Sequence, residues 1–267
     1  MKKLIPALCM LLVSAILLGT STFAWFSMNT QVSATGMQIK AQAEGGIVIS
    51  NEAKSTWTAS ATASHDSVAE LIPTSTADVT AWYHNTSDNA ADAKAGQAAA
   101  TYDTLTCADG NSDGVFTATV GTEVKNIYLL NKFYIKSSAA EAMTVTGGLL
   151  INEVTVSGTG TSAALDASLR VAIKIGGTVY IYAPVANATA SYVVAGSGST
   201  TTCKTTDKNV ATSVTSIPGN ATDAPVEAQV YLYFEGEDAA CKSDNIAATL
   251  DTLQVSVRFG TTAIPTT

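Results

Sequence analysis

Charged side chains are scarce in this chain of 267 residues. Only 13% of the residues are Asp, Glu, Lys or Arg, whereas about 25% is usual for a soluble globular protein. The only two arginines are Arg170 and Arg258, and the net charge is −8. Phosphate-binding surfaces need clustered Lys and Arg, so the composition argues against nucleic acid as a partner.

Histidine is equally rare, because the chain contains only His65 and His84. Two histidines leave little material for a catalytic triad or a zinc site. We therefore expect a protein that is not an enzyme, and a function that depends on architecture.

Long apolar runs are confined to the N-terminus. A short basic stretch, residues 1–3, precedes the apolar run Leu4–Leu18, and small residues follow up to Ala24. This layout is typical of a secretory signal peptide, here residues 1–24, with a cut after Ala24. The alternative is an uncleaved membrane anchor, because residues 4–26 are long enough to cross a hydrocarbon core of ~30 Å. In either case we expect contact with the membrane only through this segment.

Three cysteines remain after removal of that segment: Cys107, Cys203 and Cys241. Secreted proteins meet an oxidising environment, so one disulfide and one free thiol are the simplest account. Three pairings are possible, and Cys203–Cys241 closes the shortest loop.

Alternation of period two begins directly after the signal segment and predicts an N-terminal strand, residues 25–43. The first part begins at Trp25. The side chains that share one of its faces are Phe26, Met28, Thr30, Val32 and Ala34. The phase changes at Gly36, after which Met37 and Ile39 share a face. A shift by one residue turns every side chain to the other face of a sheet. We therefore expect Gly36 to be a bulge or hinge between two strand segments.

The rest of the chain, residues 44–267, predicts an all-β domain with long polar insertions at about 52–115 and 195–223. We expect the first insertion to have little regular structure of its own. Strong strand signals lie at Val115–Val120, Val124–Ile135, Met143–Val156, Leu165–Ile175, Thr178–Val185, Val226–Phe234 and Leu250–Phe259. The sequence Ile175-Gly-Gly-Thr178 predicts a two-residue hairpin, because glycine adopts a positive φ at little cost. Helical periodicity between them is missing, which excludes a parallel α/β fold. Seven or eight strands with long connections favour a jelly-roll β-sandwich.

Three parts of the chain resemble the TasA/camelysin group of bacterial surface fibre proteins. They are the aromatic junction at residues 22–27, the strand and turn at 131–138 with the returning strand at 152–156, and the segment 228–238 with the closing strand at 253–259. The resemblance covers about half of the chain and implies a jelly-roll subunit that polymerises by donor-strand exchange. It also implies a secreted protein of a Gram-positive bacterium, located in an extracellular fibre, pilus or biofilm matrix on the cell surface.

The residues themselves fit such a mechanism. A strand that fills a gap in a neighbouring subunit must be free at one end, alternate in polarity and lack proline, and residues 25–34 satisfy all three conditions. Its backbone would pair with an open sheet edge, while Phe26, Met28 and Val32 would enter a groove. We therefore predict a homopolymer of identical subunits. The competing interpretation is an ordinary first strand of the same domain.

A second class of function is a monomeric cell-surface adhesin or carbohydrate-binding module. Trp57, Trp82, Tyr83 and His84 offer aromatic surface that could stack on a sugar or, more simply, pack an insertion against the sandwich.

One segment resembles the first half of a calcium-binding loop. Asp109, Asn111 and Asp113 alternate and Gly114 follows, but position twelve of such a loop would be Val120, which cannot supply a bidentate carboxylate. Possible calcium binding and a plain hairpin turn built from Asp, Asn and Gly therefore both stay open.

Overall fold

The computed structural model describes residues 32–34, 38–51, 54–64, 69–85, 102–110, 114–157, 168–184, 199–221, 224–236 and 253–266. The predicted signal peptide or hydrophobic helix at 1–24 lies outside these residues. Within the described ranges every regular element is a β-strand, so the predicted all-β class is confirmed.

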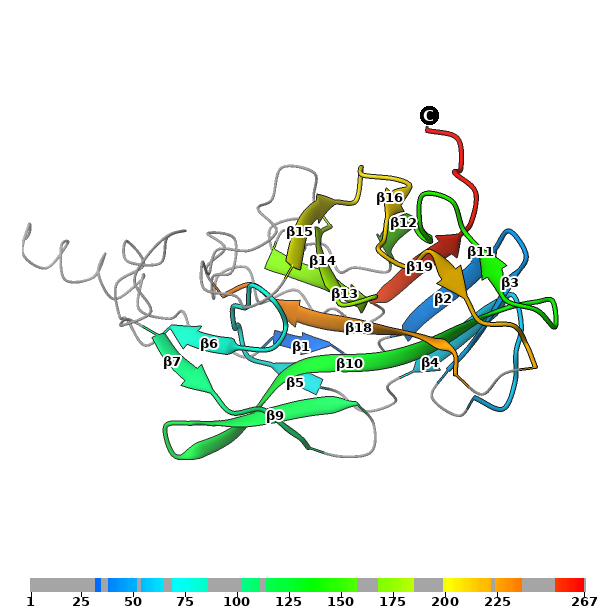
Figure 1. The fold of residues 1–267 in the computed structure, drawn as a ribbon. Coiled ribbons are helices and arrows are strands. Elements are labelled where there is room, and N and C mark those ends of the chain that lie inside the picture. The colour runs from blue at the N-terminus through cyan, green and yellow to red at the C-terminus, as the bar shows by residue number, and fades with distance from the viewer. Residues whose placement is uncertain are drawn as a thin grey trace, which may run out of the picture.

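The larger of two main sheets has ten strands and is built around one long strand, β10. Its principal path runs β1-β5-β10-β18-β13-β14-β15 (Figure 1). The bounds are β1 (Val32–Ala34), β5 (Ala69–Leu71), β10 (Glu123–Ser137), β18 (Val226–Phe234), β13 (Leu169–Ile175), β14 (Thr178–Ala183) and β15 (Ser199–Lys204). Further strands join β10 directly or through β9: β3 (Ile47–Ser50), β8 (Ala108–Asp109) and β9 (Val115–Val120).

The smaller main sheet has five strands in the order β16-β12-β19-β2-β4. The bounds are β16 (Val210–Ala211), β12 (Leu150–Ser157), β19 (Gln254–Gly260), β2 (Gln38–Glu44) and β4 (Ser60–Ser64). Two short pairs complete the described strands: β6 (Trp82–Asn85) with β7 (Tyr102–Leu105), and β11 (Met143–Thr144) with β17 (Ser216–Ile217).

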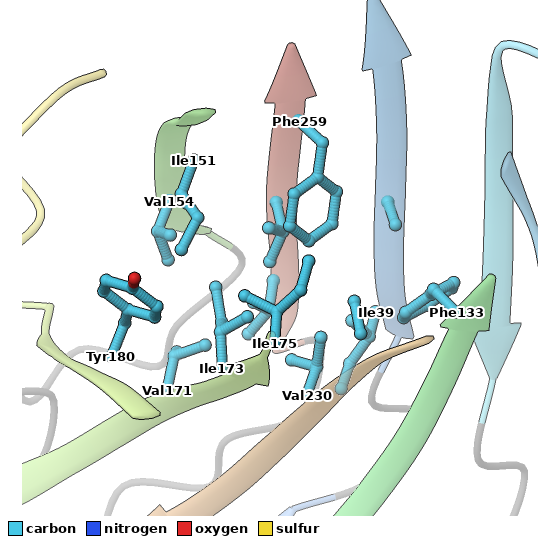
Figure 2. Close-up of a cluster of buried hydrophobic side chains, with 14 of the residues drawn as sticks. Ile39, Phe133, Ile151, Val154, Val171, Ile173, Ile175, Tyr180, Val230 and Phe259 are labelled. Carbon is cyan, nitrogen blue, oxygen red and sulfur yellow. The ribbon is translucent and has the colours of Figure 1, made fainter. Parts of the chain in front are cut away.

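The core lies between the two main sheets. Successive side chains of a strand point to opposite faces, so alternate residues such as Val171, Ile173 and Ile175 face inward and are almost fully buried. Figure 2 shows them opposite Ile151, Val154 and Phe259 of the other sheet. Burial of apolar side chains contributes roughly 1.5–3 kcal/mol each, and this shared interior makes the two sheets a sandwich.

The seven strand signals of the sequence all correspond to strands, two of them with identical bounds, Val115–Val120 and Val226–Phe234. The segment Met143–Val156 is divided into β11 and β12 at Gly147 and Gly148, which have φ of 87° and 91°. A positive φ is energetically costly for residues other than glycine, so the two glycines suit a turn at these positions.

The expectation that residues 52–115 have little regular structure of their own is wrong. The stretch supplies β4 to the smaller sheet and β5 to the larger one, in addition to β6, β7 and β8. The strand β4 reads Ser-Ala-Thr-Ala-Ser, and the residues packed against the core are Ala61 and Ala63. Small side chains give a weak alternation signal, which is why this strand was missed.

Residues 195–223 also contain more structure than an insertion would suggest. The strand β15 pairs with β14 in parallel over six positions, from Thr178↔Ser199 to Ala183↔Lys204. Its sequence is Ser-Thr-Thr-Thr-Cys-Lys, and among residues 200–204 only Cys203 is buried. An edge strand that buries one side chain does not need hydrophobic alternation, and its polar sequence therefore looked like a loop.

The predicted two-residue hairpin at Ile175–Thr178 is confirmed, and it yields a first testable prediction. Ile175 pairs with Thr178, and Gly176 and Gly177 have φ of 59° and 82°, as a type I′ turn requires. A Cβ at Gly177 would meet nothing within 4 Å, whereas one at Gly176 would lie 2.6 Å from Ser213 Oγ. Gly177→Ala should therefore cost about 1–2 kcal/mol of unfolding free energy through its backbone angle alone, and Gly176→Ala should cost more.

Urea unfolding of the two variants measures this difference. Gly177→Asn is the matched control, because Asn tolerates positive φ better than Ala, and it should be less destabilising than Gly177→Ala. Equal losses for Gly176→Ala and Gly177→Ala would contradict the contact with Ser213.

Candidate functional site

The N-terminal strand segment is divided between the two main sheets. Its first part, β1, belongs to the larger sheet, and its second part, β2, belongs to the smaller one. Residues 35–37 join them and lie outside the described residues, as does the predicted hinge Gly36. The predicted separation into two strand segments is therefore confirmed, whereas a bulge or hinge at Gly36 stays a prediction.

The first part, β1, is held at the edge of the larger sheet by a short contact. It pairs antiparallel with β5 at three positions, Val32↔Leu71, Ser33↔Glu70 and Ala34↔Ala69 (Figure 1). The strand β5 is itself joined to β10 through one bridge, Asn126↔Leu71, and a 2.9 Å hydrogen bond from Ile72 N–H to the Asn126 carbonyl.

The direction of that hydrogen bond shows which groups of β5 face β1. Successive residues of a strand direct their backbone groups to alternate sides. Because Ile72 faces β10, Leu71 and Ala69 face β1. The N–H groups of Val32 and Ala34 therefore lie on the side of β5, and that of Ser33 points away from it.

The second part, β2, is fixed in the interior of its sheet. It forms a parallel ladder of seven positions with β19, from Gln38↔Gln254 to Glu44↔Gly260, and an antiparallel ladder with β4. Ile39 and Ala41 are fully buried in the core. Arg258 Nε lies 3.3 Å from Glu44 Oε1 across the parallel ladder. This arrangement anchors the chain directly after the three residues 35–37.

The predicted polymerisation strand is thus described only in its last part. Val32 and Ala34 lie in β1, while Trp25, Phe26, Met28 and Thr30 lie outside the described residues. The sequence did not reveal that β1 and β2 lie in different sheets, or that β5 is the neighbour of β1. The tripeptide of β5, Ala-Glu-Leu, carries no signal that would have identified it.

The aromatic side chains considered as a sugar-binding platform have another role. Trp82 is only 2% exposed; it stacks on Tyr128 at a centroid distance of 4.3 Å and meets Tyr233 edge-on at 5.0 Å. Trp57 lies instead under the ammonium of Lys136, 4.6 Å from its ring centroid. A sugar platform that includes Trp82 is therefore wrong, and the alternative, packing of the insertion against the sandwich, is confirmed for this residue.

Two cysteines lie in the described part, and both are free. Burial raises the pKa of the Cys203 thiol to about 11 and that of Cys107 to about 11 as well. The thiolate is the reactive form, so both sulfurs are weak nucleophiles at neutral pH. Cys241 lies outside the described residues, and the pairing Cys203–Cys241 stays a prediction.

The proposed calcium loop begins at an exposed hairpin. Asp109 ends β8 and pairs with Phe116, and the N–H of Gly110 donates to the carbonyl of Val115 at 2.9 Å. Asn111 and Asp113 lie outside the described residues. Across the part of the chain that the structure describes, no group of three or more His, Cys, Asp or Glu side chains is placed to hold a metal ion. Calcium binding stays a prediction.

Comparison with family models, with curated proteins and with solved structures found no match to this chain. No helix among the described residues is long and apolar enough to span a membrane. The geometry of the N-terminal strands is therefore the basis of the functional argument.

His84 links the stability of the aromatic cluster to pH. The side chain is 6% exposed, its Nδ1 lies 3.3 Å from the carbonyl oxygen of Pro73, and it pairs across β6 and β7 with Asp103. Burial lowers the pKa of His84, and this effect outweighs the hydrogen bond to Pro73 and the charge of Asp103. The unfolded state, with a histidine pKa of about 6.5, therefore takes up a proton at a higher pH than the folded state.

We expect the full stability above about pH 6.5 and a loss of stability as the pH falls below it. Denaturant midpoints at about pH 7 and pH 5 measure this change. In His84→Gln, which removes the titrating group, the difference between the two midpoints should be smaller. An equal difference in the two proteins would show that His84 does not control it.

Proposed function

We propose that this protein is a secreted structural subunit that assembles head-to-tail into an extracellular fibre through its N-terminal strand. The observation that carries the proposal is the division of residues 32–44 between the two sheets. The interior strand β2 holds the chain in its own subunit, while β1 occupies a sheet edge through three paired residues. A strand placed in this way can leave its own β5 and pair with the β5 of a neighbour.

Exchange of this kind uses contacts that already exist within one subunit. The register Val32↔Leu71 to Ala34↔Ala69 can form within one molecule or between two, with the same hydrogen bonds in each case. Domain swapping is inexpensive for this reason, since both states contain the same pairings. Residues 25–31 would extend the strand along the neighbour, where Phe26 and Met28 would each contribute roughly 1.5–3 kcal/mol on burial.

A contact between the N-terminal strand of one subunit and β5 of the next joins two different surfaces. Such a heterologous contact produces an open filament unless its rotation closes a ring. The same proposal includes the predicted jelly-roll arrangement and the resemblance to the TasA/camelysin group. It also includes the secretion signal at 1–24 and the location on a Gram-positive cell surface. The two-sheet sandwich with β1 at the edge of its larger sheet is the part of the fold that supports it.

A pair of proline variants tests which strand is shared. Ala34→Pro removes an N–H that faces β5, and Ser33→Pro removes one that points away from it. Proline is tolerated on edge strands where its nitrogen faces solvent. Ala34→Pro weakens the pairing of β1 with β5 both within one subunit and between two, so it favours an unpaired β1. The yield of sedimentable filaments should therefore fall, by up to about 10-fold if the lost hydrogen bond is worth ~1.4 kcal/mol, and Ser33→Pro should reduce it much less.

Negative-stain microscopy and sedimentation measure the filaments, and circular dichroism checks that both variants keep the sandwich. Deletion of residues 25–35 should abolish filaments and leave a folded monomer. Filaments that form equally well in Ala34→Pro, Ser33→Pro and the deletion variant would exclude donor-strand assembly. Glycan binding by the monomer in place of filaments would favour the adhesin.

A further inference from the structure

The strand β15 lies at the end of the larger sheet, and β1 lies at the other end of the same path of strands. It pairs with β14 in parallel over six positions, and no strand of the described residues pairs with its other side. The side chains of Thr200, Thr201 and Thr202 are exposed. The last strand of a sheet carries backbone N–H and C=O groups without a ladder partner, and such groups can pair with another strand.

Two hydrogen bonds at the C-terminal end of β15 show which backbone groups point away from β14. The N–H of Thr205 donates to the carbonyl of Ala183, the last residue of β14, at 3.2 Å, so residue 205 faces β14. The N–H of Lys204 donates instead to Asp207 Oδ2 at 2.8 Å. Because successive residues direct their backbone groups to alternate sides of a strand, Lys204 faces away from β14, and Asp207 caps its N–H there.

The same alternation places the backbone groups of Thr200 and Thr202 on the outer side of β15, while those of Thr201 face β14. We call the N–H and C=O groups of Thr200 and Thr202 the open edge. It ends at Lys204, whose N–H is already bound by Asp207.

The side chains around the open edge do not block a further strand. Natural edge strands are protected by proline, by charged side chains or by a bulge. Residues 199–203 contain no proline and no charge, and their register with β14 is continuous. The hydroxyl of Thr200 donates to the carbonyl of Ala77 at 2.9 Å, which holds this end of the strand in place. Threonine is also favoured in strands, and pairs of threonine across two strands are stabilising.

The open edge is complementary to itself about a two-fold axis at Thr201. When two copies of β15 run antiparallel with their Thr201 residues opposite each other, Thr200 of each copy lies opposite Thr202 of the other. Each of these two pairs exchanges both of its N–H···O=C bonds, as hydrogen-bonded pairs of an antiparallel ladder do. A register shifted by two residues would pair one of the threonines with residue 198 or with the capped Lys204. The register centred on Thr201 is therefore the one that uses the whole open edge and nothing else.

We propose that β15 pairs with β15 of a second copy of this chain, so that the larger sheets of two copies join into one continuous sheet. The self-complementary spacing of the open edge favours a second copy over an unrelated strand. Such a contact uses the same surface on both partners and closes on itself, so it produces a dimer and no filament. Only two residues of each strand pair, and the contact between two monomers is therefore weak. It becomes strong where many copies are aligned, since linked contacts act as one multivalent interaction.

The inference does not rest on the proposed function. The strands β15 and β1 lie at different ends of the larger sheet, and a protein that forms no fibre would pair through β15 in the same way. In a fibre, the same contact would join two filaments side by side.

A cysteine at position 201 tests the two-fold axis. The two copies of residue 201 would form a non-hydrogen-bonded pair with their Cα atoms ~4.5 Å apart, which lies within the range of ~4.4–6.8 Å that a disulfide requires. Under mild oxidation of the full chain, Thr201→Cys should therefore give a disulfide-linked dimer. Thr202→Cys is the matched control, because this residue is also exposed but would lie opposite Thr200, and it should give little dimer. The wild type under the same oxidant measures the contribution of the native cysteines, and mass spectrometry of the linked peptides identifies position 201.

A second pair of variants tests whether backbone groups form the contact. Thr202→Pro removes an N–H of the open edge, and the two-fold axis makes this loss occur twice in each dimer. Proline is tolerated on an edge strand where its nitrogen faces solvent, so the monomer should keep its fold, which circular dichroism checks. Two hydrogen bonds are worth about 10-fold in an association constant. The yield of linked dimer should fall by about that factor in T201C/T202P, whereas T201C/T202V, which keeps the N–H, should retain it.

Three outcomes would overturn the proposal: a Thr201→Cys variant that gives no more dimer than Thr202→Cys, a linkage that does not join the two copies of position 201, or equal yields in T201C/T202P and T201C/T202V. The substitution Ala34→Pro, which should reduce filaments, should leave the dimer through position 201 unchanged. Strand exchange and β15 pairing can therefore fail separately. A dimer that is lost in T201C/A34P would show that it depends on β1 and would also overturn the proposal.

Discussion

The parallel pairing of β2 with β19 is the contact on which the rest of the structure depends. It joins the two ends of the described chain over seven positions, and it places Ile39 and Ala41 beside Val255 and Val257 in the core. Parallel strands require a long connection between them, and here nearly the whole domain is that connection. The strand β2 is held on both sides, by β19 and β4, whereas the preceding described strand, β1, lies in the other sheet.

The strand β1 lies at the edge of the larger sheet, where it pairs with β5. Edge strands expose unpaired backbone groups and are the natural sites of strand addition. The same geometry that completes the sandwich therefore produces a strand that can be shared between molecules.

The outer face of the larger sheet has an apolar part that is covered and a polar part that needs no cover. An outer face of Tyr128, Leu130, Tyr231 and Ile181 is too apolar to remain in water, and residues 72–85 with 102–109 cover it. The adjacent rows are occupied by Lys132, Gln229 and Lys174, which need no cover. In a chain with so few charges, the concentration of lysines on one face gives the molecule a polarity that its composition does not suggest.

The alternation of apolar and polar residues determined the all-β class, the boundaries of the strongest strands, the glycine hairpin at 176–177 and the division of the N-terminal segment near Gly36. These features are local, because side-chain period and backbone angles act within a few residues. Only the tertiary structure decided that β1 and β2 belong to different sheets, that Ala-rich β4 and Thr-rich β15 are strands, and that Trp82 is buried. Each of these features depends on which distant strand is the neighbour in the sheet. That neighbour supplies hydrogen bonds and apolar surface, and a local sequence pattern does not identify it.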